Sequence, residues 1–140
     1  MQKLILDTNV MVSALISNAI PTRILYDWVL TNKVKPCLSE EVFEEYVEVL
    51  NRDKFARFSN FKMKAEIVLS RIKEVATLYY PEQKVDMLTD KSDNKFLELA
   101  LISKADYLIT GNTVDFTLSE FESTKIVTPR TYWEEHLPFD

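Results

Sequence analysis

The chain alternates short, continuous apolar runs with longer segments in which apolar residues recur every three or four positions. The first run, Leu4–Leu6, leads directly into Asp7, and a second run begins at Val10. Continuous apolar runs are typical of strands buried on both faces, and the wider spacing is typical of helices. Strands are predicted over residues 3–7, 34–38, 77–80, 107–110 and 125–128. Helices are predicted over residues 9–18, 21–30, 39–50, 60–76 and 93–103, from Pro129 onward, and as a single turn over 118–121.

The order of these elements predicts an α/β fold. Strands that alternate with helices assemble into a parallel sheet with helices on both faces. A chain of 140 residues, 46% of them hydrophobic, is expected to form a single domain over residues 1–140. No apolar run approaches the roughly 20 residues of a membrane helix, and no signal peptide is recognisable. Cys37 is the single cysteine, which excludes a disulfide within the chain, and a cytoplasmic location is expected.

Charge is distributed unevenly along the sequence. The net charge of −5 argues against a protein that binds nucleic acid by overall attraction. Residues 52–73 nevertheless contain seven basic and two acidic residues, which gives +5 in this segment and leaves −10 for the rest. The segment either holds a phosphate backbone or is a solvated helix face. Its candidate nucleic-acid-binding residues are Arg52, Lys54, Arg57, Lys62 and Lys64.

Single residues argue against several common kinds of site. Gly111 is the one glycine, whereas the dinucleotide fingerprint and the P-loop each need several. His136 is the one histidine and lies near the C-terminus, so a Ser–His–Asp or Cys–His mechanism is not expected. Cys37 lies inside an apolar strand and is interpreted as a core residue.

Three acidic residues stand out by their positions. Asp7 follows a buried strand, at the edge where open α/β sheets bind ligands. Asp93 lies in the first turn of its helix, on the face of Phe96 and Leu97, although the helix dipole alone also favours an acid there. Glu45 lies at the margin of an apolar helix stripe, where it either extends to water or meets a partner in a cleft.

The strand at 107–110 is followed by Asn112 and Asp115, again at the carboxyl end of a strand. A turn without chemistry is the alternative, because Gly, Asn and Asp are common turn residues. Thr8 and Thr110 could support the acids or serve as capping and turn residues. Acids brought together need a cation, and oxygen ligands without histidine or cysteine favour magnesium or manganese.

The order of these segments resembles the PIN-domain family, metal-dependent nucleases that include toxins of prokaryotic toxin–antitoxin pairs. The resemblance lies in Leu4–Val10, Ser39–Leu50, Asp93–Ala100 and Ala105–Asn112, and extends to the closing Thr128-Pro129. It covers nearly the whole chain, although none of these motifs is specific by itself. It implies a five-stranded parallel sheet between helices, and an acidic site that holds Mg²⁺ or Mn²⁺ and hydrolyses RNA phosphodiester bonds.

The resemblance also assigns roles to individual residues. Asp7, Glu45 and Asp93 match acidic positions of the family. Many members have a further acid directly after the glycine, where this chain has Asn112, and this departure concerns a second metal more than the first. The expected catalytic residues are Asp7, Glu45, Asp93 and Asp115. The expected metal ligands are Asp7, Glu45, Asp93, Asn112 and Asp115.

Partners and alternative functions remain open at this point. The resemblance implies an RNA substrate, a cognate antitoxin and a homodimer, for which Trp28, Trp133 and Phe139 could provide apolar contacts if they do not pack in the core. One alternative is an inert PIN-like binding module. Another is an aspartyl-phosphate phosphatase of the haloacid-dehalogenase type, although such enzymes have a second Asp where this chain has Asn9.

Overall fold

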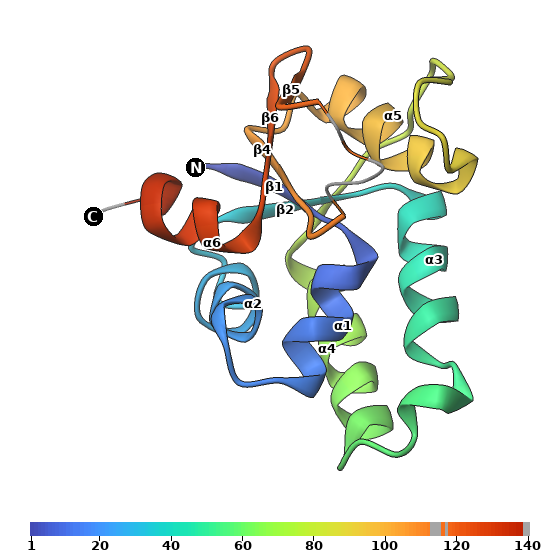
Figure 1. The fold of residues 1–140 in the computed structure, drawn as a ribbon, viewed down its shortest axis with the longest axis vertical. Helices are drawn as coiled ribbons and strands as arrows, with labels where there is room; N and C mark the ends of the chain where they lie inside the picture. The colour runs from blue at the N-terminus through green and yellow to red at the C-terminus, as the bar shows by residue number, and fades with distance from the viewer. Residues whose placement is uncertain (113–115, 117, 139–140) are drawn as a thin grey trace.

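The structure is a computed structural model that describes residues 1–112, 116 and 118–138 (Figure 1). The strands are β1 (Lys3–Leu6), β2 (Lys35–Leu38), β3 (Thr77–Leu78), β4 (Tyr107–Ile109), β5 (Glu120–Phe121) and β6 (Thr124–Val127). The α-helices are α1 (Thr8–Ile16), α2 (Ile20–Arg23), α3 (Glu40–Leu50), α4 (Phe61–Val75), α5 (Asn94–Ser103) and α6 (Pro129–Thr131). Shorter helical segments are η1 (Ile24–Val29), η2 (Asp53–Phe55), η3 (Lys91–Asp93) and η4 (Tyr132–His136).

The strands form one sheet in the order β3-β2-β1-β4-β6-β5. β1 lies in the middle and pairs in parallel with β2 on one side and with β4 on the other. From β1 the chain first adds β2 and β3 on one side, and then crosses over to add β4 and β6 on the other. The order therefore reverses between β1 and β4, which makes the gap between their carboxyl ends the topological switch point of the sheet.

The predicted α/β class and its five parallel strands are confirmed, but the sheet has a sixth strand. β5 pairs antiparallel with β6, so the single helical turn predicted over 118–121 is wrong. The two strands are joined by a tight turn in which Glu122 has a positive φ of 52°. Two-residue hairpins are usually marked in sequence by Asn-Gly or similar pairs, and this turn has no such mark.

The sheet lies between two groups of helices (Figure 1). α5 lies on one side of the strands, and α1, α2 and α4 lie on the other. The central strands β1, β2 and β4 fit this environment because most of their side chains are buried on both faces. Leu4 and Ile5 in β1 are fully buried, as are Leu108 and Ile109 in β4. The continuous apolar runs of the sequence therefore have their expected cause, and β1 is held in the centre of the core.

Helices α3 and α4 form a hairpin that extends away from the sheet (Figure 1). The N-terminus of α3 is capped as predicted, because the Ser39 hydroxyl accepts a hydrogen bond of 3.2 Å from the backbone N–H of Val42. Val42, Tyr46 and Leu50 form the buried stripe of α3. The connection at the far end of the hairpin includes η2 and contains the start of the basic segment.

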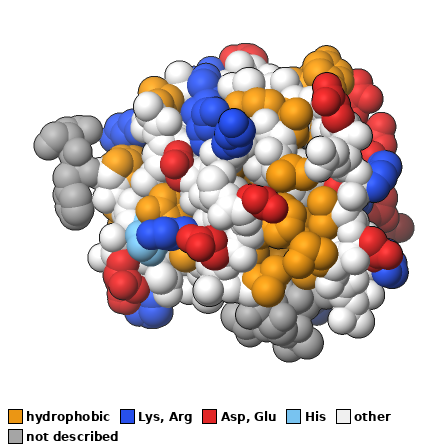
Figure 2. All heavy atoms as spheres, turned by 90° about the horizontal axis from the view of Figure 1, so that it is seen from above, with side chains coloured by type: hydrophobic (Ala, Val, Ile, Leu, Met, Phe, Trp, Pro, Cys, Tyr) orange, Lys and Arg blue, Asp and Glu red, His pale blue; other side chains and the backbone are white. Residues whose placement is uncertain are grey.

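The surface shows no single dominant charge on the face seen in Figure 2. Charged side chains of both signs are spread over it, and a group of hydrophobic side chains reaches the surface among them. Trp28 and Trp133 are partly buried and pack against the core, and Phe139 lies outside the described residues. Within the part of the chain that the structure describes, no helix is long and apolar enough to cross a membrane.

Cys37 provides a test of this core. Its side chain is 1% exposed in β2, and burial raises the pKa of its thiol to about 11. Because the thiolate is the reactive form, we expect native protein at pH 8 to react with iodoacetamide at least about tenfold more slowly than unfolded protein. Mass spectrometry of samples labelled with and without guanidinium measures this difference. Equal labelling rates would contradict the buried position.

Candidate metal centre

Asp7 lies at the switch point of the sheet, directly after the last residue of β1. Its backbone N–H continues the ladder by donating to the carbonyl of Ile109 in β4, at 2.9 Å. Its own carbonyl accepts from the N–H of Val10 in the first turn of α1. The residue is thus fixed on one side by the sheet and on the other by the helix. Its side chain is 3% exposed.

The Asp7 carboxylate is oriented by a short chain of hydrogen bonds. The Thr110 hydroxyl donates to Asp7 Oδ2 at 2.6 Å, and the backbone N–H of Asn112 donates to the same hydroxyl at 2.9 Å. Burial raises the pKa of the Asp7 carboxyl, and the charge of Glu45 raises it further. The bond from Thr110 and the N–H groups of Thr8 and Asn9 offset part of this rise. The ionised carboxylate is therefore stabilised by nearby donors and yet destabilised by its burial.

Glu45 faces this carboxylate from the middle of α3, so it meets partners in a cleft rather than extending to water. Its side chain is 16% exposed. One of its oxygens accepts a hydrogen bond from the Thr8 hydroxyl, and the other lies 2.9 Å from Lys95 Nζ. The next residue, Tyr46, is buried and donates its hydroxyl to the carbonyl of Leu6. Two adjacent residues of α3 therefore join it to the start of α1 and to the end of β1.

Asp93 reaches the site from the junction of η3 and α5. Ser92 precedes the predicted helix over 93–103 and serine commonly caps helices, but Ser92 does not cap this element. Asp90 caps η3 instead, because its carboxylate accepts from both the N–H and the hydroxyl of Ser92, at 3.0 and 2.7 Å. Sequence reasoning missed this because Ser92 and Asp90 are both good capping residues, and the choice depends on where the preceding loop runs.

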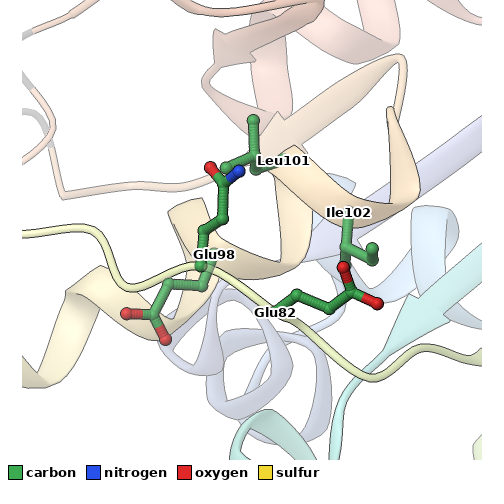
Figure 3. A pocket seen from close by; sticks show the side chains of 5 residues that line it. Glu82, Glu98, Leu101 and Ile102 are labelled. Carbon is green, nitrogen blue, oxygen red and sulfur yellow. The ribbon is translucent and has the colours of Figure 1, made fainter.

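That preceding loop is fastened to α5 by two buried polar residues. Asn94 accepts hydrogen bonds from the backbone N–H groups of Met87 and Leu88, and Glu98 accepts one of 2.9 Å from Val85. A pocket of about 200 Å³ lies between the loop and α5. Figure 3 shows Glu98 and neighbouring side chains of α5 around this pocket. The loop is thus held by a few specific bonds, and these fix the chain that leads to Asp93.

Together these elements bring three carboxylates to one point. Asp7, Glu45 and Asp93 each offer a carboxylate oxygen, and these oxygens lie within 4.8 Å of one another. Asp7 is buried, and the other two are partly exposed. Carboxylate oxygens at this separation are the hard ligands that suit Mg²⁺, Mn²⁺ or Ca²⁺ rather than a soft metal. The donor set therefore fits a divalent cation of this kind.

The other predicted site residues have different positions. Asn112 is joined to Asp7 through Thr110, as described above, whereas Asp115 lies outside the described residues. His136 lies against the ring of Tyr107, with its Nδ1 3.2 Å from the tyrosine oxygen. It takes part in fixing the C-terminal segment.

The candidate binding residues of the basic segment lie near the far end of the α3–α4 hairpin, in its connection and in the first turn of α4. All five of its candidate residues, Arg52, Lys54, Arg57, Lys62 and Lys64, are exposed. Lys54 and Arg57 lie over the rings of Phe55 and Phe58, at 5.1 and 4.9 Å. Arg52 makes two hydrogen bonds to Glu48, which offset part of its charge.

A groove of about 530 Å³ runs along α3 between Glu45 and Arg52, and its lining includes two further glutamates, Glu41 and Glu44, but neither Asp7 nor Asp93. Glu45 and Lys95 line one part of it, and Glu48 and Arg52 line another. The helical rise places Arg52 roughly 10 Å beyond Glu45 along α3. The groove thus reaches the start of the basic segment, although its own lining has four acidic and two basic residues.

Comparison with known proteins agrees with this geometry. The sequence model of the PIN domain family matches residues 3–114, which include all three carboxylates, and the chain therefore belongs to this family. PIN domains are typically nucleases that use a divalent metal ion. The uncharacterized protein MJ1680 of Methanocaldococcus jannaschii is 28% identical over 146 residues, an alignment that covers 98% of this chain and 93% of that protein.

The buried charge of Asp7 leads to a prediction about stability. Its pKa is raised in the folded state, so the fold binds this proton more tightly than the unfolded chain does, and the ionised form destabilises the fold at neutral pH. Without metal, we expect Asp7→Asn to unfold at a higher temperature than wild type, on the order of 2–4 °C. With Mn²⁺ the order should reverse, because metal binding stabilises the wild type. Calorimetry of both proteins, in EDTA and in Mn²⁺, measures these unfolding temperatures. A variant that unfolds below wild type in EDTA would contradict this electrostatic description.

Proposed function

We propose that this chain is a metal-dependent endoribonuclease that hydrolyses RNA phosphodiester bonds with Mg²⁺ or Mn²⁺. The proposal rests on the convergence of Asp7, Glu45 and Asp93 within 4.8 Å at the switch point of a PIN-domain fold. Three carboxylates held this close repel one another, and a bound divalent cation relieves that repulsion. Such an arrangement is costly to maintain in a site with no cation to bind.

The three carboxylates would hold the metal, with Asp7 and Asp93 as direct ligands and Glu45 bound directly or through water. Asn112 or Asp115 would complete the shell. When bound, the metal supplies activation of water and stabilisation of charge on the phosphate in an in-line displacement. Since the fourth family position is an amide in Asn112, we propose one metal rather than two.

The neighbouring residues have defined tasks in this proposal. The hydroxyls of Thr110 and Thr8 orient the carboxylates of Asp7 and Glu45, each by a direct hydrogen bond. These bonds direct the free carboxylate oxygens towards a common point. Residues that hydrogen-bond to metal ligands have the same effect in other metal sites. The basic segment holds phosphates that flank the scissile bond. This division explains how an acidic protein could bind RNA: attraction is local and lies beside the site.

The biological role is a further proposal. We propose that the nuclease is the toxin of a toxin–antitoxin pair, acting in the cytoplasm as a single domain and controlled by a cognate antitoxin. This role follows from the family resemblance alone. A homodimer remains a prediction, and the partly buried positions of Trp28 and Trp133 favour core packing over a role in such an interface.

An inert binding module is the second candidate, and the observation that favours it is Asn112 in place of an acid. Retention of the other three carboxylates in one cluster favours the nuclease. Metal binding separates the two, because an inert domain has no need of a cation. Calorimetric titration with Mn²⁺ is expected to show binding to the wild type and at least about tenfold weaker binding to Asp7→Asn.

Cleavage itself is the direct test. We expect the wild type to cut a mixed pool of single-stranded RNA in Mn²⁺ or Mg²⁺ and not in EDTA. Asp7→Asn should lose at least about a hundredfold in rate, because it removes a metal ligand while retaining shape. Asp27→Asn, at an exposed position on η1, is the matched control and should cut normally. An Asp7→Asn variant that folds and cuts at the wild-type rate would overturn the proposed site.

The role of the basic segment predicts a change in salt dependence. Binding of single-stranded RNA in Ca²⁺ is measured by fluorescence anisotropy over a series of salt concentrations, with gels to confirm that the RNA stays intact. Replacing Lys62 and Lys64 by Gln should lower the slope of log affinity against log salt by about 1.4, because each phosphate contact contributes about 0.7. Replacing Lys33 and Lys125 by Gln makes the same change in net charge at exposed sites elsewhere. Equal slopes in the two double variants would mean that the segment is a solvated helix face.

A further inference from the structure

Lys95 lies in the site although sequence reasoning did not select it. It follows Asp93 by two residues, in the first turn of α5, and its Nζ lies 2.9 Å from Glu45 Oε1. Its position in the sequence, between Asn94 and Phe96, gave no sign of a contact with Glu45, which lies 50 residues earlier. The residue meets Glu45 only because α3 and α5 lie side by side at the site.

The Lys95–Glu45 pair differs from the surface ion pairs in its burial. The two side chains are 20% and 16% exposed. By contrast, Lys91 and Asp86 are 73% and 71% exposed in their pair, although Lys91 lies only four residues away. Burying most of an ammonium group costs free energy unless it is paired with groups of opposite charge. Lys95 therefore has the character of a site residue rather than of a solvated surface lysine.

The positive charge of Lys95 also affects the net charge of the site. Its ammonium offsets one of the three ionised carboxylates, and one divalent cation would offset the other two. With the amide of Asn112 as the fourth ligand, the loaded site would then be neutral to an incoming RNA phosphate, whereas without Lys95 it would stay negative. An ammonium has three donors, and the bond to Glu45 uses one of them. The others remain for a second acceptor, and Lys95 also lines the groove that leads to Arg52.

We propose that Lys95 is a substrate-binding residue that donates to a phosphate oxygen of RNA beside the metal, while Glu45 holds its ammonium in place. This inference rests on the proposed nuclease function and adds a residue to it. Two separate predictions follow for the variant Lys95→Met. Metal binding should not depend on Lys95, because its charge repels a metal cation. RNA binding should depend on it, because it contacts a phosphate.

The experiment compares wild type, Lys95→Met and Lys95→Arg, with Lys91→Met as the matched control. Lys91 is suitable because it lies in the adjacent turn and pairs with exposed Asp86 rather than with the carboxylates. Calorimetric titration with Mn²⁺ in the absence of RNA gives metal affinity. Anisotropy of a labelled single-stranded RNA in Ca²⁺ gives RNA affinity and its salt dependence. Thermal unfolding shows that each variant is folded.

For Lys95→Met we expect Mn²⁺ binding at least as tight as in wild type. RNA binding should be about tenfold weaker, with a salt slope lower by about 0.7. Lys95→Arg should restore most of the RNA affinity, and Lys91→Met should match the wild type in all three measurements.

Two results would overturn the role of Lys95. One is loss of Mn²⁺ affinity in Lys95→Met with an unchanged RNA salt slope, which would mean that Lys95 only positions Glu45. The other is an equal effect of Lys91→Met, which would mean that any nearby positive charge suffices. Either result leaves the nuclease assignment in place if the wild type cuts RNA and Asp7→Asn does not. A wild type that neither binds nor cuts RNA would instead overturn both proposals.

Discussion

The structure depends on holding like charges together where water is partly excluded. Asp7 cannot withdraw from Glu45 and Asp93, because it is fixed between a central strand and the first turn of a helix. The apolar side chains of β1, which are almost fully buried, provide the free energy that keeps Asp7 in this position. Hydroxyl groups, helix N–H groups and one ammonium offset part of the repulsion. Sites that retain such unfavourable electrostatics are commonly functional, since their disadvantage to stability is offset by ligand binding.

The order of the strands explains why the acids meet at this point. The strand order reverses between β1 and β4, so the connections on the two sides of β1 diverge and leave a crevice at the carboxyl ends of these strands. Asp7 and Thr110 occupy the two sides of this crevice, and their hydrogen bond joins them directly. Glu45 reaches the same place from α3, and Asp93 reaches it from the junction of η3 and α5. A change in strand order would separate these residues even if every local element were preserved.

Much of this could be predicted from the sequence, because the relevant signals are local. Continuous apolar runs located all five parallel strands, and the position of Asp7 after the first run placed it at the ligand-binding edge of the sheet. Asp93 followed from helical spacing. The sixth strand could not be predicted, because glutamate at the positive-φ position of the hairpin, Glu122, is not a residue type that marks a turn. The cap at Asp90 could not be predicted either, because Asp90 and Ser92 are both residue types that commonly cap helices.

The sequence by itself determined the class of fold, the buried strands and the position of Asp7 after the first strand, since each depends on residue types and on spacing within one element. Tertiary structure decided which way Glu45 faces and that Lys95 pairs with it. Glu45 meets Thr8, 37 positions away, and Lys95, 50 positions away. At the margin of a helix stripe, water and a cleft are both available to a carboxylate, and helical periodicity cannot distinguish them. The choice is made by whichever distant elements pack against that helix, and this is settled only when the whole chain folds.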